Sequence, residues 1–281
     1  GLGLFLVPRV RPDGSLNAFQ IRRLKDKLGT RSMASAEIDF SGAYAEALGP
    51  VGSGFKHVME LVITTSRLFN AAGCAAHARR AWVIASTYAQ HRQAFGQPIG
   101  RFAQVRETLA WMRSDAAAAI ATTLWLAGLL EKIEAGTATD AEAAFFRVAV
   151  NLNKLETALR AHDVVNQGIE VLGGNGAIES FSILPRLLRD NVVYENWEGT
   201  HNVLRAQMLR DCTRLGVHQG FFEVLGVHLG EDAGLDGDRQ ALTEILAEPG
   251  DIAELKFRRL CDRLAAHLSC AALVQNPALS A

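Results

Sequence analysis

The sequence predicts a mainly α-helical protein with a short β-rich segment at its start. Two observations support this prediction. Apolar residues recur every three or four positions over 102–135 and 139–172, and they alternate strictly with polar residues only within the first fifty residues. Two helices of more than thirty residues, each about 50 Å long at 1.5 Å per residue, can bury their apolar stripes only against each other and against similar helices. We therefore expect a helical bundle.

The opening segment, residues 1–50, reads as β structure. Pro12-Asp-Gly-Ser15 is a turn signal between two strands, and residues 36–40 alternate apolar and acidic side chains. Three strands are too few to close a sandwich or a barrel, and the chain starts at Gly1 without a methionine. We therefore expect the second half of a β-domain whose first half lies in a missing part of a longer protein.

The segment 51–214 is the predicted helical bundle. Its first part, from Phe55 to about His91, has a helical period and is expected to form one long helix, or two if the helix breaks near Gly73. Gly96-Gln-Pro-Ile-Gly100 then reads as a loop. The chain therefore turns back at this point to start the second helix of the bundle.

The ends of the next two helices carry clear signals. Gly136 ends the helix over 102–135, and Thr139-Asp-Ala-Glu142 is a capping box that starts the following helix. That helix is expected to run to Gly173, where a glycine can end it.

The segment 215–281 is predicted to be an acidic helical extension. Residues 230–238 read as a polar hinge, and 252–273 as a last amphipathic helix. From Gly216 onward the chain has ten Asp or Glu against five Lys or Arg. Such a segment repels phosphates, so the sequence disfavours nucleic acid as a partner.

Composition narrows the class of protein. The net charge is −1, hydrophobic residues make up 49% of the chain, and we find neither a charged leader nor an uninterrupted apolar span of membrane length. The four cysteines are widely spaced and no His/Cys cluster has metal-ligand spacing, so we expect reduced thiols and no metal site. These features predict a cytoplasmic protein.

The main candidate for chemistry is Glu198. It follows Trp197 and precedes Gly199, Thr200 and an amphipathic helix pattern, which places a carboxylate at a loop-to-helix junction. A carboxylate beside an indole ring and partly removed from water can serve as a general base. The alternative is that Glu198 only favours the start of the helix, with Thr200 as its N-cap.

Two further motifs have both a structural and a functional interpretation. Gly173-Gly-Asn-Gly176 can be a helix C-cap, or it can let a cofactor phosphate approach the backbone. Arg92-Gln-Ala-Phe-Gly96 can be a helix end with a solvated arginine, or an anion site. The residues alone leave these alternatives open.

Six motifs in order give the chain a resemblance to the acyl-CoA dehydrogenase superfamily over roughly residues 1–212. The resemblance implies a C-terminal four-helix domain that follows a β-domain. The motifs are Lys25-Asp-Lys-Leu-Gly-Thr-Arg31, Gly52-Ser-Gly-Phe-Lys56, Thr65-Ser-Arg67, Arg92-Gln-Ala-Phe-Gly96, Gly173-Gly-Asn-Gly176 and Trp197-Glu-Gly-Thr200.

The resemblance implies FAD as the cofactor. Some of the implied contacts reach the FAD of the neighbouring subunit and others follow the catalytic loop, so the pocket would span a homodimer or homotetramer. This chain alone is therefore expected to hold little or no flavin. The implied cofactor contacts are Arg92, Phe95, Gly173, Gly174, Thr200 and Asn202.

The resemblance also implies the reaction. Glu198 matches the base that removes the α-proton of an acyl-CoA while a hydride leaves the β-carbon, and Arg67 matches an arginine on the substrate-side helix. Some relatives place the base on an earlier helix, at the position of Ser66, where serine cannot serve. That difference favours Glu198.

Two other functions are weighed against this one. Residues 25–36, Glu170 and Trp197-Glu-Gly resemble most the branch that contains the bacterial alkylation-response flavoprotein, which suggests a DNA-associated protective role. The acidic extension opposes that role. The other alternative is a helical interaction module that binds no flavin. Acyl chain length and electron acceptor are not encoded in any motif we identify.

Overall fold

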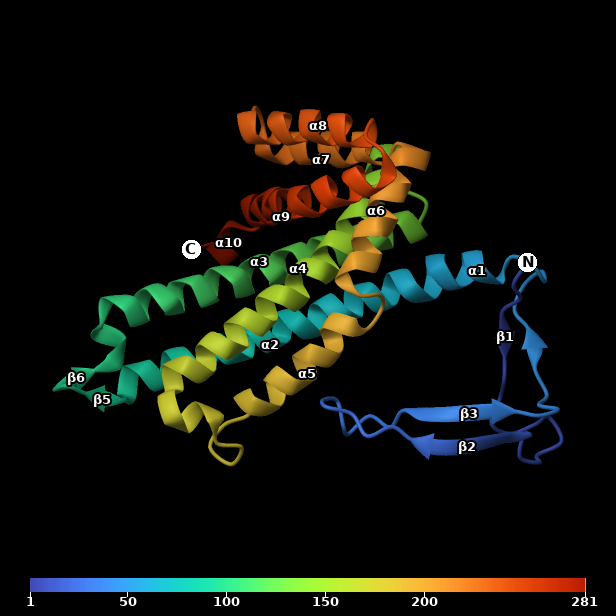
Figure 1. Cartoon of the computed structure of the whole chain (residues 1–281), viewed down its shortest axis with the longest axis horizontal. Coiled ribbons are helices and arrows are strands. Elements are labelled where there is room, and N and C mark those ends of the chain that lie inside the picture. The colour runs from blue at the N-terminus through green and yellow to red at the C-terminus, as the bar shows by residue number, and fades with distance from the viewer. Residues whose placement is uncertain (281) are drawn as a thin grey trace. The chain divides into compact units, whose positions relative to one another are not determined.

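The computed structural model describes residues 1–280 and confirms a mainly α-helical chain (Figure 1). It divides into two compact units, one formed by Gly1–Ser66 and one that starts at Arg67. The first unit contains the elements β1 (Phe5–Leu6), β2 (Phe19–Leu24), β3 (Ala36–Phe40), β4 (Glu46–Ala47), α1 (Gly54–His57) and a π-helical turn, η1 (Val58–Ile63).

The second unit is almost entirely helical. Helix α2 (Thr64–His91) begins just before it. The remaining elements are β5 (Gln93–Ala94), β6 (Gln97–Pro98), η2 (Ile99–Arg101), α3 (Ala103–Glu134), α4 (Asp140–Leu172), η3 (Gly173–Ala177), α5 (Leu184–Asn196), α6 (His201–Leu215), α7 (His218–Leu229), α8 (Ala233–Leu246), α9 (Gly250–Gln275) and α10 (Pro277–Ser280).

The first unit is built on short antiparallel strand pairs. β2 pairs with β3 so that Phe19 lies opposite Phe40 and Ile21 lies opposite Ile38. The side chain of Asn17, which is buried, donates hydrogen bonds to the backbone oxygens of Pro8 (2.7 Å) and Tyr44 (2.8 Å). β structure is thus present where alternation predicted it, although most apolar side chains of the ribbon are exposed to solvent.

Helix α2 is continuous through Gly73, so of the two alternatives the unbroken helix is the one found and the break near this glycine is absent. A Cβ atom at position 73 would lie only 2.5 Å from Cε1 of Tyr194. Gly73 is therefore needed for the close approach of α5 rather than for a bend. The irregular part of this helical run is the π-helical turn η1, which precedes α2.

Helices α3 and α4 have the predicted ends. Gly136 follows α3 with a positive φ of 68°, and the capping box is complete: Thr139 Oγ1 accepts from Glu142 N (3.1 Å) and Glu142 Oε2 accepts from Thr139 N (2.9 Å). α4 ends at Leu172, and Gly173 is its C-cap. Local signals alone therefore located the longest helices correctly.

Helices α2, α3, α4 and α5 form one apolar core, and Figure 1 shows them running alongside one another. Most of the core side chains are small, which lets the helix axes approach closely. The core residues include Cys74, Ala78, Ala81, Ala85, Met112, Ala116, Ala158, Ala161, Val164, Val165, Leu172, Leu184 and Leu187.

By length and composition alone, α3 could cross a membrane, and it is the one helix among residues 1–280 that could. In the folded chain, apolar residues of α3 pack against other helices. Met112 lies in the core of the bundle, and Leu126 and Leu129 lie in a second core shared with the C-terminal helices. The apolar character of α3 is therefore used in packing between helices.

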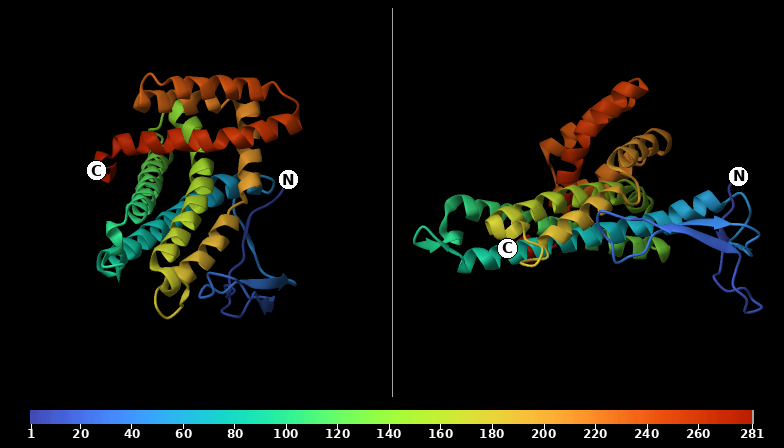
Figure 2. Two further views of the ribbon diagram at one scale, coloured as in Figure 1. Left: turned by 60° about the vertical axis from the view of Figure 1, so that its left-hand side comes forward. Right: turned by 60° about the horizontal axis from the view of Figure 1, so that its bottom comes forward.

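The extension packs on the bundle through this second core. Phe221 of α7 stacks on Phe145 of α4 with ring centroids 5.5 Å apart, and α9 crosses α3 and α4 (Figure 2). A Cβ atom at Gly220 would lie 2.8 Å from the backbone oxygen of Ala141, so α7 sits directly on α4.

The predicted hinge over 230–238 is mostly helix, and that prediction is wrong. α8 already starts at Ala233, because the side chain of Asp232 caps it by accepting from the backbone N of Leu235 (2.8 Å). The amphipathic helix predicted for 252–273 is found within α9. Polar and glycine residues around 234–238 therefore face solvent or neighbouring helices instead of forming a loop.

Candidate functional site

The candidate site centres on the turn between α5 and α6. α5 ends at Asn196, α6 begins at His201, and Glu198 lies between them as the sequence predicted. Glu198 has a φ of 59° and Gly199 has a φ of 108°. A left-handed conformation is costly for a residue with a Cβ, so surrounding contacts must hold Glu198 in place. Its side chain is half-buried.

Arg67 provides one of these contacts from the start of α2. Its Nε donates to the backbone oxygen of Glu198 at 3.1 Å, and its Nη1 donates to Oδ1 of Asn151 at 2.6 Å. The side chain is buried, and burial lowers the pKa of Arg67 while the charges of Glu198 and Asp211 oppose that shift. Arg67 is thus a fixed buried cation beneath the turn.

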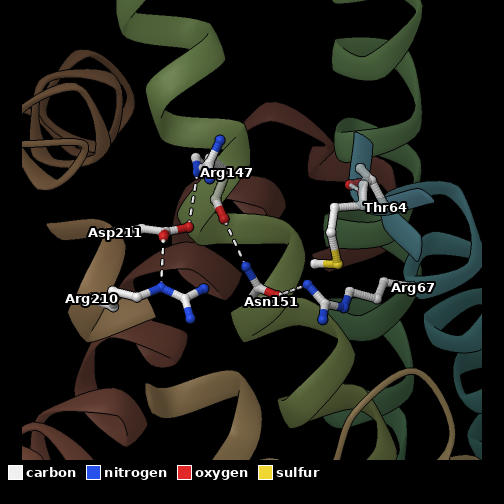
Figure 3. Close-up of polar contacts among 7 residues, drawn as sticks. Thr64, Arg67, Arg147, Asn151, Arg210 and Asp211 are labelled. Carbon is white, nitrogen blue, oxygen red and sulfur yellow. Dashed lines mark hydrogen bonds and ion pairs between the residues drawn. The ribbon is translucent and has the colours of Figure 1, made fainter. Parts of the chain in front are cut away.

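A chain of polar contacts extends from Arg67 across α4 to α6 (Figure 3). Asn151 Nδ2 donates to the backbone oxygen of Arg147 at 2.8 Å, and Arg147 Nε lies 2.8 Å from Oδ2 of Asp211. Arg210 Nε lies 3.6 Å from the other oxygen of the same carboxylate. These contacts orient Asn151, which in turn fixes the plane of the Arg67 guanidinium.

Lys154 of α4 provides a second hold on the turn. Its Nζ donates to the backbone oxygens of Glu195 (2.8 Å) and Gly199 (2.9 Å), and the residue is 0% exposed. Burial lowers the pKa of Lys154 to about 8. Sequence reasoning missed this residue. The available signal was a group of polar residues, Asn151, Asn153 and Lys154, between the apolar residues Val150 and Leu155 of the same helix.

The last turn of α5 is also fixed by side chains. Asn70 Nδ2 donates to the backbone oxygen of Tyr194 at 3.0 Å, and Asn191 Nδ2 donates to that of Ala158 at 2.8 Å. The carboxylate of Glu195 lies 2.9 Å from Nδ1 of His162 on α4. Glu195 is therefore engaged with α4, whereas the Glu198 carboxylate makes no hydrogen bond or ion pair with another side chain among residues 1–280.

Thr200 and Asn202 lie at the start of α6, next to Glu198. Thr200 is the N-cap residue, but its side chain makes no capping hydrogen bond. Both residues are exposed, and Asn202 Oδ1 accepts from Nη1 of Arg205 at 3.4 Å. Asn202 also lines a groove of about 410 Å³ between α6 and α9. Both side chains are therefore accessible to a ligand.

Arg92 and Phe95 lie on the β5–β6 hairpin, which follows α2 where the sequence predicted a loop. Phe95 and Gly96 form its two-residue turn, with φ values of 51° and 84°, a combination typical of tight hairpins. Phe95 is 95% exposed, and its ring lies edge to face with that of Phe102 at 6.3 Å between centroids. The hairpin thus presents an aromatic ring to the outside.

Gly173 and Gly174 follow α4, in a segment that contacts the last turn of α2. Gly173 has a φ of 61°, and a Cβ atom at either position would meet nothing within 4 Å. Asn175 Nδ2 donates to the hydroxyl of Tyr88, in the last turn of α2, at 3.1 Å. Gly176 is needed for close packing against the backbone of α4, since a Cβ atom there would lie 2.1 Å from the backbone oxygen of Ile169.

The predicted site residues therefore form two groups at opposite ends of α2. Arg67 and Arg92 are 25 positions apart along this helical run, which corresponds to about 38 Å. Glu198, Arg67, Thr200 and Asn202 lie at one end. Arg92, Phe95, Gly173 and Gly174 lie at the other.

Within residues 1–280, no group of three or more His, Cys, Asp or Glu side chains is arranged to hold a metal ion. The four cysteines are free; Cys74, Cys212 and Cys261 are buried and Cys270 is exposed. Burial raises the pKa of each of the three buried thiols to about 12. These thiols are therefore protonated and unreactive at neutral pH.

Residues 52–212 match the family model "Acyl-CoA dehydrogenase, C-terminal domain". Among curated proteins, the chain is 34% identical over 252 residues to the putative acyl-CoA dehydrogenase AidB of Escherichia coli, covering 89% of this chain and 46% of AidB.

Solved structures show the same similarity. The chain is 31% identical to Caenorhabditis elegans ACDH-11, solved in complex with C11-CoA, with a TM-score of 0.82 and coverage of 97% of this chain and 49% of that one. An acyl-CoA dehydrogenase from Bacillus anthracis, solved with FAD, shares the fold at 18% identity, with a TM-score of 0.76 and coverage of 99% and 55%. The chain thus spans about half the length of these proteins.

Proposed function

This chain belongs to the acyl-CoA dehydrogenase family, and from that membership we propose that it takes part in FAD-dependent α,β-dehydrogenation of an acyl-CoA thioester. The observation that carries the proposal is the turn at Glu198: a half-buried carboxylate on a left-handed backbone, held from below by two buried cations. Backbone strain maintained by dedicated contacts is typical of functional sites. The C11-CoA bound to ACDH-11 supports an acyl-CoA as the class of substrate.

In this proposal Glu198 accepts the α-proton of the thioester. Within the part of the chain that the structure describes, its carboxylate pairs with no other side chain, whereas the carboxylate of Glu195 is engaged with His162. Arg67 directs its Nε and Nη1 toward Glu198 O and Asn151. We infer that Arg67 influences the substrate by fixing the base, since both of these donors are already in use.

The second group of residues fits FAD. Within the described residues, the exposed Arg92 guanidinium has no ion-pair partner, and the exposed Phe95 ring can stack on an aromatic ligand. Gly173 and Gly174 expose backbone with open space where side chains would be. This donor set suits a ligand with a pyrophosphate and flat rings. FAD, when bound, supplies the acceptor for the hydride that leaves the β-carbon.

The distance between the two groups implies more than one copy of the chain. The two groups lie at opposite ends of α2, about 38 Å apart, so within one copy they cannot both surround the same reacting atoms. We propose that Glu198 of one copy and the Arg92 hairpin of another contribute to one cofactor site, in a homodimer or homotetramer. Each pocket then becomes complete only on assembly.

The test is Glu198→Gln in the complete protein loaded with FAD. Glutamine keeps the shape of the side chain but cannot accept the α-proton, so we expect acyl-CoA-dependent bleaching of the flavin to be abolished at nearly unchanged flavin content. Glu195→Gln is the matched control, because that carboxylate faces His162, and should bleach at close to the wild-type rate. The double variant combines Glu195→Gln with Glu198→Gln. If it bleaches at the wild-type rate, this turn takes no part in the mechanism.

A different result is expected if Glu198 only favours the start of α6. Glu198→Gln would then lower the free energy of unfolding by about 0.3–1 kcal/mol through the helix dipole and leave bleaching intact. Urea unfolding of the same variant distinguishes this outcome from the catalytic one.

A further inference from the structure

Lys154 is a fully buried lysine whose two hydrogen bonds both go to the backbone around Glu198. Burying an ammonium group without partners is costly, because it loses its water shell. The Nζ of Lys154 donates to two acceptors, the backbone oxygens of Glu195 and Gly199, at 2.8 and 2.9 Å. A residue this costly to bury and this specifically placed calls for a role beyond filling space in the core.

The two acceptors lie on either side of the candidate base. Glu195 is in the last turn of α5, whose final backbone oxygens have no partner within the helix. Gly199 directly precedes Thr200, the N-cap of α6. Lys154 therefore acts as a C-cap supplied by another helix, and it joins the end of α5 to the start of α6 across Glu198.

Arg67 completes this arrangement. It binds the backbone oxygen of Glu198 itself, so two cations from α2 and α4 hold three backbone oxygens within five residues. A strained φ of 59° at Glu198 persists only where neighbouring contacts determine the backbone. Removal of either cation allows the turn to relax.

We propose that Lys154 is a positioning residue, which fixes the backbone on both sides of Glu198 and thereby sets the rate of proton abstraction without touching the substrate. The inference about rate rests on the proposed function of Glu198. The inference that Lys154 holds the turn does not, so the two can be tested separately.

The experiment compares Lys154→Met with Asn153→Leu in the complete protein loaded with FAD. Methionine keeps the length of the side chain but donates no hydrogen bond. Asn153 is the neighbouring residue on α4 and is also buried, but its Nδ2 donates to Thr123 on α3 at 3.1 Å rather than to the turn. Both variants thus remove buried polar contacts of α4, and only one of them frees the turn.

The first measurement is hydrogen–deuterium exchange in peptides that cover residues 192–200. We expect exchange there to rise about tenfold or more in Lys154→Met and to remain near wild type in Asn153→Leu, because opening of the turn is a local event. Equal exchange in the two variants would show that Lys154 only stabilises the fold, and would overturn the proposal.

The second measurement is flavin bleaching at saturating acyl-CoA together with the Kd for acyl-CoA. Lys154→Met should bleach at least about tenfold more slowly with an unchanged Kd, since a small displacement of a catalytic group lowers the rate more than binding. Wild-type bleaching despite faster exchange would overturn the positioning role. If Glu198→Gln also bleaches normally, the proposed function has failed, and exchange alone decides whether Lys154 holds the turn.

A second substitution covers the case in which Lys154→Met does not fold. Lys154→Gln has a shorter side chain with a neutral amide donor, so intermediate exchange and an intermediate bleaching rate are expected. A Lys154→Gln protein that matches wild type in both measurements would contradict the proposal.

Discussion

Arg67 Nε donates a hydrogen bond to the backbone oxygen of Glu198 at 3.1 Å, although the two residues are 131 positions apart in the chain. The contact connects the start of α2 to the turn that precedes α6. Arg67 also binds Asn151, which belongs to the polar chain that ends at Asp211 and Arg210. The position of the candidate base is thus determined by residues from three helices.

We expect Arg67→Met to impair both stability and proton abstraction. The substitution leaves two buried acceptors, Glu198 O and Asn151 Oδ1, without their donor, which costs about 1–3 kcal/mol each at most. Urea unfolding and flavin bleaching would measure the two effects. Arg79→Met is the control: Arg79 is exposed on the same helix, and neither quantity should change. Equal losses in the two variants would contradict a specific role for Arg67.

Substitution of Phe95 should affect the cofactor and not the fold. Because its ring is 95% exposed, Phe95→Ala is expected to change the free energy of unfolding by less than about 0.5 kcal/mol in the flavin-free protein. In the complete protein that carries FAD, the flavin content after purification should fall. Val227→Ala, at a 78% exposed position of α7, is the control and should keep its flavin. Normal flavin content in Phe95→Ala would remove the hairpin from the proposed site.

Gly73→Ala should destabilise the bundle. The new Cβ atom would lie 2.5 Å from the Tyr194 ring, an overpacking that typically costs about 1–3 kcal/mol. Gly128→Ala is the matched control in α3, where a Cβ atom meets nothing within 4 Å, and it should stabilise the helix by about 0.5–1 kcal/mol. Thermal unfolding of both variants would show opposite shifts in Tm; shifts of the same sign would contradict this assignment.

The buried amine of Lys154 should make stability depend on pH in a defined direction. Its pKa is about 8 in the folded chain and 10.5 when exposed, so between these values the unfolded chain binds more protons and stability rises with pH. The gain in the free energy of unfolding from deprotonating Lys154 is absent below about pH 8 and complete above pH 10.5. The neutral amine keeps two N–H groups for its two acceptors. Urea unfolding at pH 7.5 and 9.0 should show a larger gain for wild type than for Lys154→Met; equal gains would mean that the amine is not protonated differently in the two states.

The chain should self-associate. Trp111 and Leu124 on α3 are 62% and 64% exposed, and Phe95 projects from the hairpin, so a monomer would leave large apolar side chains in water. We expect sedimentation velocity at micromolar concentration to give a dimer or tetramer. A species of about 30 kDa would contradict both this expectation and the shared cofactor site.

The helices were predictable where local signals determine them. The Thr139 capping box and Gly136 located the ends of α4 and α3, because caps act within a single turn of helix. The sequence leaves open whether the helix breaks near Gly73, because the role of this glycine is a tertiary contact with Tyr194. Asp232 was read as part of a hinge, although its side chain starts α8.

The candidate site was only partly predictable, for a related reason. Glu198 is a candidate from the sequence because its neighbours resemble a known motif, and the structure places it in the turn between α5 and α6. Lys154 was missed because a lysine in a helix is usually solvent-exposed, and its burial depends on α5 and the following turn folding over it. The separation of Arg92 from Glu198 also required the length and direction of α2, which no single motif contains.

The seating of α7 on α4 has a consequence for any chain that lacks the C-terminal helices. Gly220 allows backbone contact with α4, and Phe221 stacks on Phe145, whose ring would otherwise be exposed. The three helices α7, α8 and α9 therefore cannot behave as a detachable appendage. A chain that lacked them would expose apolar residues of α3 and α4, among them Leu126, Phe145 and Leu152, and would need polar residues at these positions to stay in solution as a folded bundle.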